Sequence, residues 1–329
     1  IFPHKMNQNK TLRKSGMSFL YLAVLFGMFL FLLCCPADGM LAVRYGLQLW
    51  SGALIPSLLP FLILSGFLVK SGMLQKLSGR FQSSRILSVE GVFAILSGFL
   101  CGFPSGARIL GDLRRSGRIS RDEAQTLVCF CNNAGPGFVV NYLLYEKLAG
   151  GDPSFQTPAL VCIYGIPLFG MILSLIWKVW TSQKNVPTQK FSYPCKEKAP
   201  RAQITFGLLD ACIYDACITI LKLGGYIVLF CILSEMTALL PFLSPRTSAI
   251  LAGVLELTGG IDRICLAFSR QEAFLLAIPL TIFGGLCTLA QTASVLKGSG
   301  LSLYPYLMAK LLMSLAGFAG AAFCCLILF

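Results

Sequence analysis

The segment AILSGFL at residues 94–100 occurs a second time in this chain, as AILAGVL at residues 249–255. Farther along, SRDEA at residues 120–124 returns as SRQEA at residues 269–273. One short gap joins the two matches, so the chain carries a duplicated unit. Glycine and proline interrupt the apolar segments of this unit, and such interruptions in a duplicated membrane unit are typical of a transporter core.

The composition predicts a membrane protein. Of the 329 residues, 56% are hydrophobic and only 12% are charged, and the mean hydropathy is +0.74. Soluble domains carry about 25% charged residues. A helix of about 20 residues crosses a bilayer, and no run alternates as a barrel strand does. We therefore expect an all-α polytopic membrane protein with about seven transmembrane helices, at residues 18–35, 47–69, 125–145, 159–180, 211–234, 274–296 and 304–329.

The basic residues predict the orientation in the membrane. The net charge is +13, but the lysines and arginines lie in short loops beside apolar segments, which indicates membrane orientation and not nucleic-acid binding. Basic loops stand on both sides of residues 89–107, so this stretch should enter and leave on the cytoplasmic face as a re-entrant hairpin. Residues 247–262 should form a second hairpin, which enters from outside. Three spans and one hairpin in each copy make the two repeats inverted.

These features divide the chain into five segments. They are a basic N-terminal segment (1–17), a first transmembrane helix and loop (18–46), repeat 1 (47–180), a cytoplasmic linker (181–203) and repeat 2 (204–329). The chain does not begin with Met, and the true start is expected at Met6 or Met17. Residues 18–35 follow a basic lead, as a signal peptide would, but Cys34-Cys35-Pro36 is a poor cleavage site, which favours an uncleaved helix.

The first hairpin has its tip at CGFPSGAR, residues 101–108. Glycine permits a close backbone approach, and proline removes an amide donor. Non-helical backbone at membrane depth persists only where protein or a wet cavity surrounds it. A substrate site with exposed backbone dipoles is the favoured interpretation, and a tight turn that only packs is the alternative. The candidate binding residues are Phe103, Ser105 and Arg108, and the helix-breaking residues are Gly102, Pro104 and Gly106.

Two of the apolar spans are interrupted near their middles. Asn132-Asn133-Ala134-Gly135-Pro136 breaks one span, and Gly284-Gly285 breaks its counterpart in the second copy. Adjacent asparagines offer donors and acceptors, and Pro136 frees carbonyl groups one turn earlier. After the second break, polar residues recur at helical spacing. We expect ligand contacts from these residues, with interhelical hydrogen bonding as the alternative; they are Asn132, Asn133, Thr288 and Gln291.

The second hairpin tip carries Glu256 within an apolar stretch, followed by Thr258 and Gly259. An ionisable residue inside a bilayer is a functional hypothesis by default, because charge there is costly. Glu256 is therefore a candidate for proton or cation coupling, and Thr258 is a candidate for substrate binding. The alternative is a structural ion pair between Glu256 and Arg263.

Other patterns favour structural roles. Ser120-x-x-Glu123 and Ser269-x-x-Glu272 fit helix capping boxes. Asp215 and Lys222 lie seven residues apart on one helix face and are expected to form a structural pair or to snorkel toward the membrane surface, and not to bind substrate. The sequence has no nucleotide-binding or hydrolase motif, its single histidine is terminal, and its cysteines lie mostly in apolar runs. We therefore expect no enzymatic activity, no cofactor and no metal site.

The motifs resemble one known family. Gly102-Phe103-Pro104-Ser105-Gly106-Ala107-Arg108, Cys131-Asn132-Asn133-Ala134-Gly135-Pro136 and Glu256-Leu257-Thr258-Gly259 are similar to segments of the YlbJ (SpoVV) sporulation integral membrane proteins. The resemblance spans roughly residues 17–329, and the family belongs to the nucleoside-recognition (Gate) domain group, which is similar to parts of concentrative nucleoside transporters. It implies a protein of the mother-cell-derived outer forespore membrane that moves dipicolinic acid. Ser105 departs from many relatives, which leaves the chemistry of the tip open.

The expected function is secondary transport of a small anionic solute, with dipicolinate as the suspected solute and the lipid bilayer as the other partner. The duplicated core, its polar breaks and the lack of a nucleotide-binding motif favour transport, whereas the preference for an anion comes mainly from the family resemblance. Two alternatives stay open. They are a non-transporting membrane scaffold for spore assembly and a transporter of a nucleoside-type solute.

The topology predicts that residue 190, within the linker, faces the cytoplasm. A Lys190→Cys substitution in a cysteine-reduced background should react with a membrane-impermeant maleimide only when the cytoplasmic face is accessible. Labelling from the opposite face alone would contradict the predicted orientation.

Overall fold

The computed structural model describes residues 19, 21–74, 87–149, 153–182 and 204–328, and the regular elements within these ranges are all helices. In this part of the chain four helices are long and apolar enough to span a membrane, Ser154–Thr181, Phe206–Ala238, Arg270–Leu296 and Leu303–Ile327. The prediction of an all-helical polytopic membrane protein is therefore confirmed. The predicted N-terminal segment 1–17 and residues 183–203 of the predicted linker lie outside the described residues.

The chain begins with a bent pair of helices, Tyr21–Cys34 and Pro36–Gly52, which meet at 114° and count as a fifth span if taken together. Pro36 accounts for the bend, because proline can begin a helix but cannot continue the preceding one. The predicted loop before residue 47 is wrong, since α2 (Pro36–Leu49) occupies it and leads through a π-helical turn, η1 (Trp50–Leu54), into α3 (Ile55–Lys70). The first half then continues with α5 (Val89–Cys101), α6 (Ser105–Arg115), α7 (Arg121–Cys131), the π-helical η2 (Gly137–Ala149), α8 (Pro153–Leu160), the π-helical η3 (Val161–Gly165) and α9 (Ile166–Ser182).

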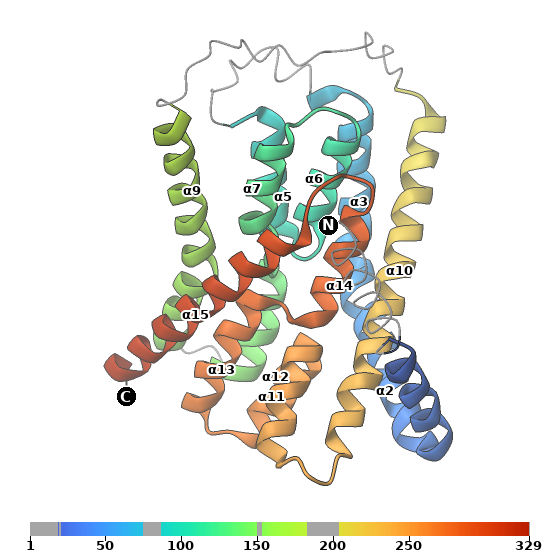
Figure 1. Ribbon diagram of the computed structural model, residues 1–329, viewed down its shortest axis with the longest axis vertical. Coiled ribbons are helices and arrows are strands. Elements are labelled where there is room, and N and C mark those ends of the chain that lie inside the picture. The colour runs from blue at the N-terminus through green and yellow to red at the C-terminus, as the bar shows by residue number, and fades with distance from the viewer. Residues whose placement is uncertain (1–18, 20, 75–86, 150–152, 183–203, 329) are drawn as a thin grey trace, which may run out of the picture.

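The second half begins with α10, the longest helix, which runs along most of the height of the molecule in Figure 1 and packs mainly against α2 and α3 of the first half. Its helices are α10 (Phe206–Ala238), α11 (Pro245–Leu255), α12 (Leu257–Ala267), α13 (Arg270–Phe283), α14 (Gly285–Leu296) and α15 (Leu303–Leu328). The largest apolar core lies among η2, α12, α13 and α15, and a second core lies among α5, α6 and α7. The two cores hold residues from both halves of the chain, so the halves fold as one body.

Two helical hairpins lie at the predicted tips. α5 packs against α6 and α11 packs against α12. Figure 1 shows that the two hairpins point toward the middle of the molecule from opposite ends. The two predicted helix breaks are also present, since α7 ends before Asn132 and α13 ends at Gly284, which has a φ of 86°. The hairpin tips and the helix breaks therefore all lie near the middle of the molecule.

The first hairpin depends on two glycines that face one carbonyl group. A Cβ atom at Gly98 would lie 1.7 Å from the carbonyl oxygen of Cys131, and a Cβ at Gly106 would lie 2.5 Å from the same oxygen. The Cβ position of Gly98 is also only 3.2 Å from the Cα of Gly106. Only glycine allows α5, α6 and the end of α7 to approach this closely.

The second hairpin is also closed by a direct contact between two glycines. A Cβ atom at Gly260 would lie 2.0 Å from the Cα of Gly253. Gly98 and Gly253 are the glycines at equivalent positions of the two duplicated segments, AILSGFL and AILAGVL. The repeated sequence therefore marks the two places where a hairpin is closed by direct backbone contact.

The duplicated Ser-x-x-Glu motifs begin α7 and α13. The Ser269 hydroxyl accepts from the Glu272 amide, and the Glu272 carboxylate accepts from the Ser269 amide, so this capping box is confirmed. Ser120 likewise caps α7, but the Glu123 carboxylate accepts from the amide and the hydroxyl of Ser88, at 2.7 Å each. In the first predicted capping box, the Glu123 carboxylate therefore binds Ser88 at the start of α5 and not the Ser120 amide, which links α7 to α5.

Gly98→Ala should destabilise the protein, because overpacking costs about 1–3 kcal/mol and the clashing atom here belongs to the backbone. We expect a several-fold loss of membrane abundance and a lower unfolding temperature in detergent. Gly225→Ala is the matched control, since nothing lies within 4 Å of its Cβ position in α10. Equal behaviour of the two variants would show that the close contact at Gly98 is not required.

Candidate functional site

The two hairpin tips and the two helix breaks meet at one junction. A Cβ atom at Gly102 would lie 2.7 Å from the amide nitrogen of Gly135, so the first tip packs directly on the first break. A Cβ at Gly284 would lie 2.8 Å from the Phe103 ring, which places this ring against the second break. The carbonyl oxygens at the end of α11 lie 3.3–3.5 Å from the Cβ position of Gly285. The contacts at Gly102 and Gly284 are too close for a larger residue unless a neighbour moves.

A lysine is buried at this junction. Lys310 of α15 is 1% exposed, and its Nζ donates to Oδ1 of Asn133 at 2.9 Å. The Nζ also lies 5.0 Å from the centre of the Phe103 ring and 5.9 Å from that of Tyr306. Among the described residues, no carboxylate is within ion-pair distance of it. Burial of a cation is unfavourable without a compensating charge or hydrogen bonds.

Asn132, the residue before Asn133 in the same break, also joins this cluster. Its Nδ2 donates to the hydroxyls of Thr292 and Tyr306, at 3.0 Å each. Its Oδ1 and the hydroxyl oxygen of Ser105 are buried and have no hydrogen-bond partner among the described residues. Buried polar atoms are nearly always satisfied, so these two atoms have capacity for a further partner. We call Phe103, Asn132, Asn133, Tyr306 and Lys310 the central cluster.

The remaining predicted site residues lie outside the central cluster. Thr288 and Gln291 are buried on α14, where the Gln291 amide donates to Sγ of Cys287 at 3.3 Å. Thr258 lies in the second tip, and its carbonyl accepts from the Tyr142 hydroxyl at 3.0 Å. Arg108 faces a separate cavity. The structure therefore brings together only part of the predicted set.

Sequence reasoning missed Lys310 and Tyr306 as members of this cluster, and it did not single out Thr292, which accepts a hydrogen bond from Asn132. The available signal was Lys310, a charged residue within an otherwise apolar span, because such residues are functional candidates by default. Tyr306 precedes Lys310 by one helical turn and therefore shares its face. Thr292 lies on the polar helical face that the sequence predicted after the second break, but only Thr288 and Gln291 of that face were chosen as candidates.

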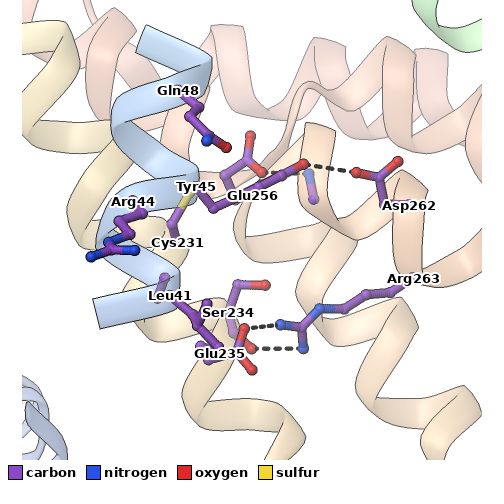
Figure 2. Close-up of a pocket in the computed structure, with 12 residues that line it drawn as sticks. Leu41, Arg44, Tyr45, Gln48, Cys231, Ser234, Glu235, Glu256, Asp262 and Arg263 are labelled. Carbon is purple, nitrogen blue, oxygen red and sulfur yellow. Dashed lines mark hydrogen bonds and ion pairs between the residues drawn. The ribbon is translucent and has the colours of Figure 1, made fainter. Parts of the chain in front are cut away.

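Glu256 occupies the second tip beside a cavity of about 490 Å³ (Figure 2). Its carboxylate accepts from the amides of Thr258 and Gly259, at 3.0 and 2.7 Å, and so caps the N-terminus of α12. The alternative pairing with Arg263 is wrong, because Arg263 binds Glu235 of α10. Glu256 thus has a clear structural role, and it also lines the cavity.

Asp262 links both halves of the chain at this cavity. Its carboxylate accepts from the hydroxyls of Tyr45 and Tyr142, at 2.8 Å each, and pairs with Lys147 at 2.9 Å. Figure 2 shows Tyr45 between Glu256 and Asp262. Because Tyr45, Tyr142 and Lys147 all precede α10, this carboxylate fastens the second hairpin to the first half.

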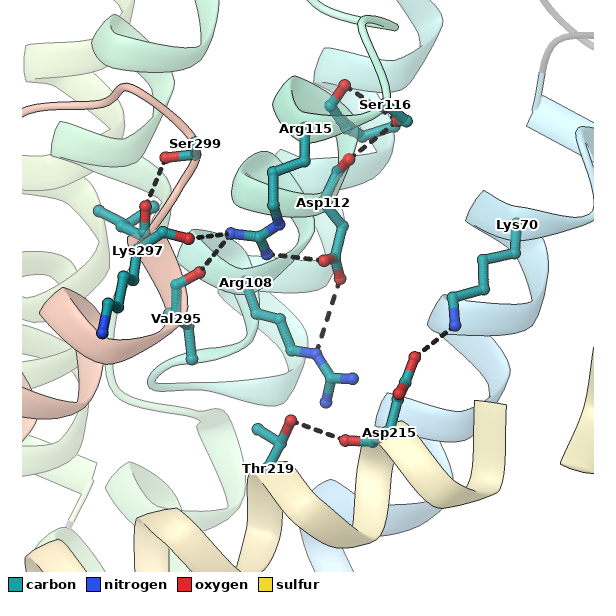
Figure 3. A network of polar contacts seen from close by, with 12 residues as sticks. Lys70, Arg108, Asp112, Arg115, Ser116, Asp215, Thr219, Val295, Lys297 and Ser299 are labelled. Atoms are coloured by element: carbon teal, nitrogen blue, oxygen red, sulfur yellow. Dashed lines mark hydrogen bonds and ion pairs between the residues drawn. The ribbon is translucent and has the colours of Figure 1, made fainter. Parts of the chain in front are cut away.

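A second cavity, of about 840 Å³, lies among α3, α6, α10 and α14. Figure 3 shows its polar network, in which Asp112 binds Arg115 at 2.7 Å and approaches Arg108 at 3.6 Å. Asp215 pairs with Lys70 of α3, so the predicted pair of Asp215 with Lys222 is wrong. The sequence could not reveal this pairing, because the partners lie 145 residues apart.

The described residues contain no group of three His, Cys, Asp or Glu side chains that could hold a metal ion.

The chain is 25% identical over 317 residues to the sporulation integral membrane protein YlbJ of Bacillus subtilis (strain 168). The match covers 84% of this chain and 75% of that protein. No family model matches the chain, and no solved structure matches it. The protein is thus a distant homologue of a sporulation integral membrane protein, as the resemblance of its motifs predicted.

Asp262→Asn should lower the unfolding temperature in detergent, because hydrogen bonds to a charged group contribute about 1.5–3 kcal/mol each. Asp210→Asn is the control, since Asp210 is an exposed carboxylate on α10 without a partner among the described residues. If both substitutions shift unfolding equally, Asp262 does not fasten the two halves.

Proposed function

We propose that this protein is a secondary transporter of a small anionic solute, which binds at the central cluster. The observation that carries the proposal is the burial of Lys310 where both tips and both breaks meet, with no carboxylate of the described chain beside it. An anionic solute would supply the missing charge. Sites of this kind, at broken helices near the middle of the membrane, are the usual substrate sites of such transporters.

The proposal includes the finer membrane architecture. Seven spans, two re-entrant hairpins and two inverted repeats are supported by hairpins that enter from opposite ends and by matched breaks after α7 and α13 (Figure 1). α7 and η2 would together form one broken span, as α13 and α14 do. Non-helical backbone at that depth is acceptable where protein buries it, as at Asn132, Asn133 and Gly284.

Dipicolinate is the proposed solute, in the outer forespore membrane of the sporulating cell. Its flat ring suits the face of Phe103, and its carboxylates suit Lys310 and the free hydroxyl of Ser105. The sporulation name of the distant relative supports this setting. Glu256 would couple transport to a proton or a cation, since it borders its own cavity beside the second tip.

The alternative is a membrane scaffold without transport. It is favoured by the mutual hydrogen bonds of Asn132, Thr292 and Tyr306, which hold three helices together without any ligand. Hydrogen bonds of this kind contribute about 0.6 kcal/mol each in membranes, so their loss should reduce stability modestly. Substitutions in the central cluster therefore separate the two functions. They should reduce solute uptake if the protein is a transporter, and reduce only stability if it is a scaffold.

Lys310→Met keeps the length of the side chain and removes its charge. We expect at least a tenfold loss of labelled dipicolinate uptake into proteoliposomes, with membrane abundance near that of the unsubstituted protein. Arg121→Gln is the control, because Arg121 is an exposed cation at the start of α7 with no partner among the described residues.

Two outcomes would reject transport through this site. Saturable uptake that persists in Lys310→Met would show that the buried ammonium does not bind solute. Absence of saturable uptake by correctly inserted, unsubstituted protein would favour the scaffold. Asn133→Ala and Gln291→Ala extend the comparison, since a parallel loss of abundance and uptake would identify these amides as structural.

A further inference from the structure

The second cavity is strongly basic. Six basic side chains line it, and only two acidic ones do, Asp112 and Asp215. The basic residues are Lys70, Arg108, Arg115, Arg118, Lys222 and Lys297. Both carboxylates are already engaged, Asp112 by Arg115 and Asp215 by Lys70 (Figure 3). The cavity therefore holds an excess of positive charge that the described chain does not neutralise.

Lys222 stands at the middle of α10, the longest apolar span. It is exposed and has no partner among the described residues, and it lines the cavity. A lysine at the centre of a span is unfavourable in contact with lipid, so its ammonium group usually faces water or other parts of the protein. Its position indicates that the cavity is wet and reaches to the depth of the membrane.

Arg108 supplies a second, independent observation. It is only 9% exposed, its Nε is 3.6 Å from Asp112, and its Nη1 is buried without a hydrogen-bond partner among the described residues. Arg115 differs, because its guanidinium is engaged by Asp112 and by the carbonyls of Val295 and Lys297. Arg108 therefore lines the cavity with an unused donor, and a guanidinium binds planar oxyanions well.

We propose that this cavity is a second ligand site, which binds an oxyanion, a carboxylate or a phosphate group, through Arg108 and Lys222. The site is distinct from the central cluster, none of whose residues line the cavity. The oxyanion comes either from a small solute or from a lipid headgroup. Binding does not require transport; a role as the entry site for a transported anion rests on the function proposed above.

The test uses the full chain purified in a neutral detergent. Inorganic phosphate and dipicolinate are titrated by calorimetry, and the unfolding temperature is compared in phosphatidylcholine bilayers with and without phosphatidylglycerol. We expect saturable binding of a soluble probe or stabilisation by the anionic lipid, and the two arms identify the source of the oxyanion. Lys222→Gln and Arg108→Gln should each weaken the effect about tenfold, as expected for the loss of one charge-assisted hydrogen bond.

Arg44→Gln is the matched control, because Arg44 is an exposed cation that lines the other cavity. Lys222 is exposed, so its substitution keeps the test decisive even if the buried Arg108 is needed for folding. The proposal is overturned if neither probe nor anionic lipid acts, if Lys222→Gln changes nothing, or if Arg44→Gln weakens the effect equally. Binding without uptake would reject the transport proposal alone, whereas saturable uptake together with no binding or stabilisation that depends on Lys222 and Arg108 would reject this site alone.

Discussion

Backbone contact at glycine is the constraint on which the structure depends. Gly98 and Gly106 close the first hairpin against the carbonyl of Cys131, and Gly253 and Gly260 close the second. Because no side chain intervenes, each tip reaches the middle of the molecule and lies on a helix break. Both breaks then expose polar backbone and side chains at a depth where only protein can satisfy them.

The junction that results is polar and enclosed. Lys310, Asn132 and Asn133 would be costly in such surroundings if left unpaired, and each binds a neighbour there. Their pairing is incomplete, however, because the hydroxyl of Ser105 and Oδ1 of Asn132 remain without partners among the described residues. A structure held together only for stability would have little reason to keep such atoms, since each costs about 1–3 kcal/mol. A site that admits a ligand accounts for them.

The hairpin tips and helix breaks could be predicted because they depend on residues that are neighbours in the chain. Single prolines such as Pro279 stay inside helices here, but the clusters Gly135-Pro136 and Gly284-Gly285 favour helix breaks. Gly102-Phe103-Pro104 likewise favours a tight turn, so tips and breaks could be placed in advance. Contacts between distant residues could not be placed. Lys310 donates a hydrogen bond to Asn133, which lies 177 residues away in the sequence, and Arg263 forms its ion pair with Glu235 and not with Glu256. The helix at residues 36–49 was missed because its charged and small residues suggested a loop.

In the proposed transporter, a solute anion balances the charge of Lys310. An experimental structure determined with dipicolinate present tests this most directly. Density for the solute is expected beside the Lys310 ammonium and the Phe103 ring, with its carboxylate also near Ser105. A well-resolved central cluster that stays empty at a saturating concentration of dipicolinate, with Lys310 still bound to Asn133 alone, would contradict it.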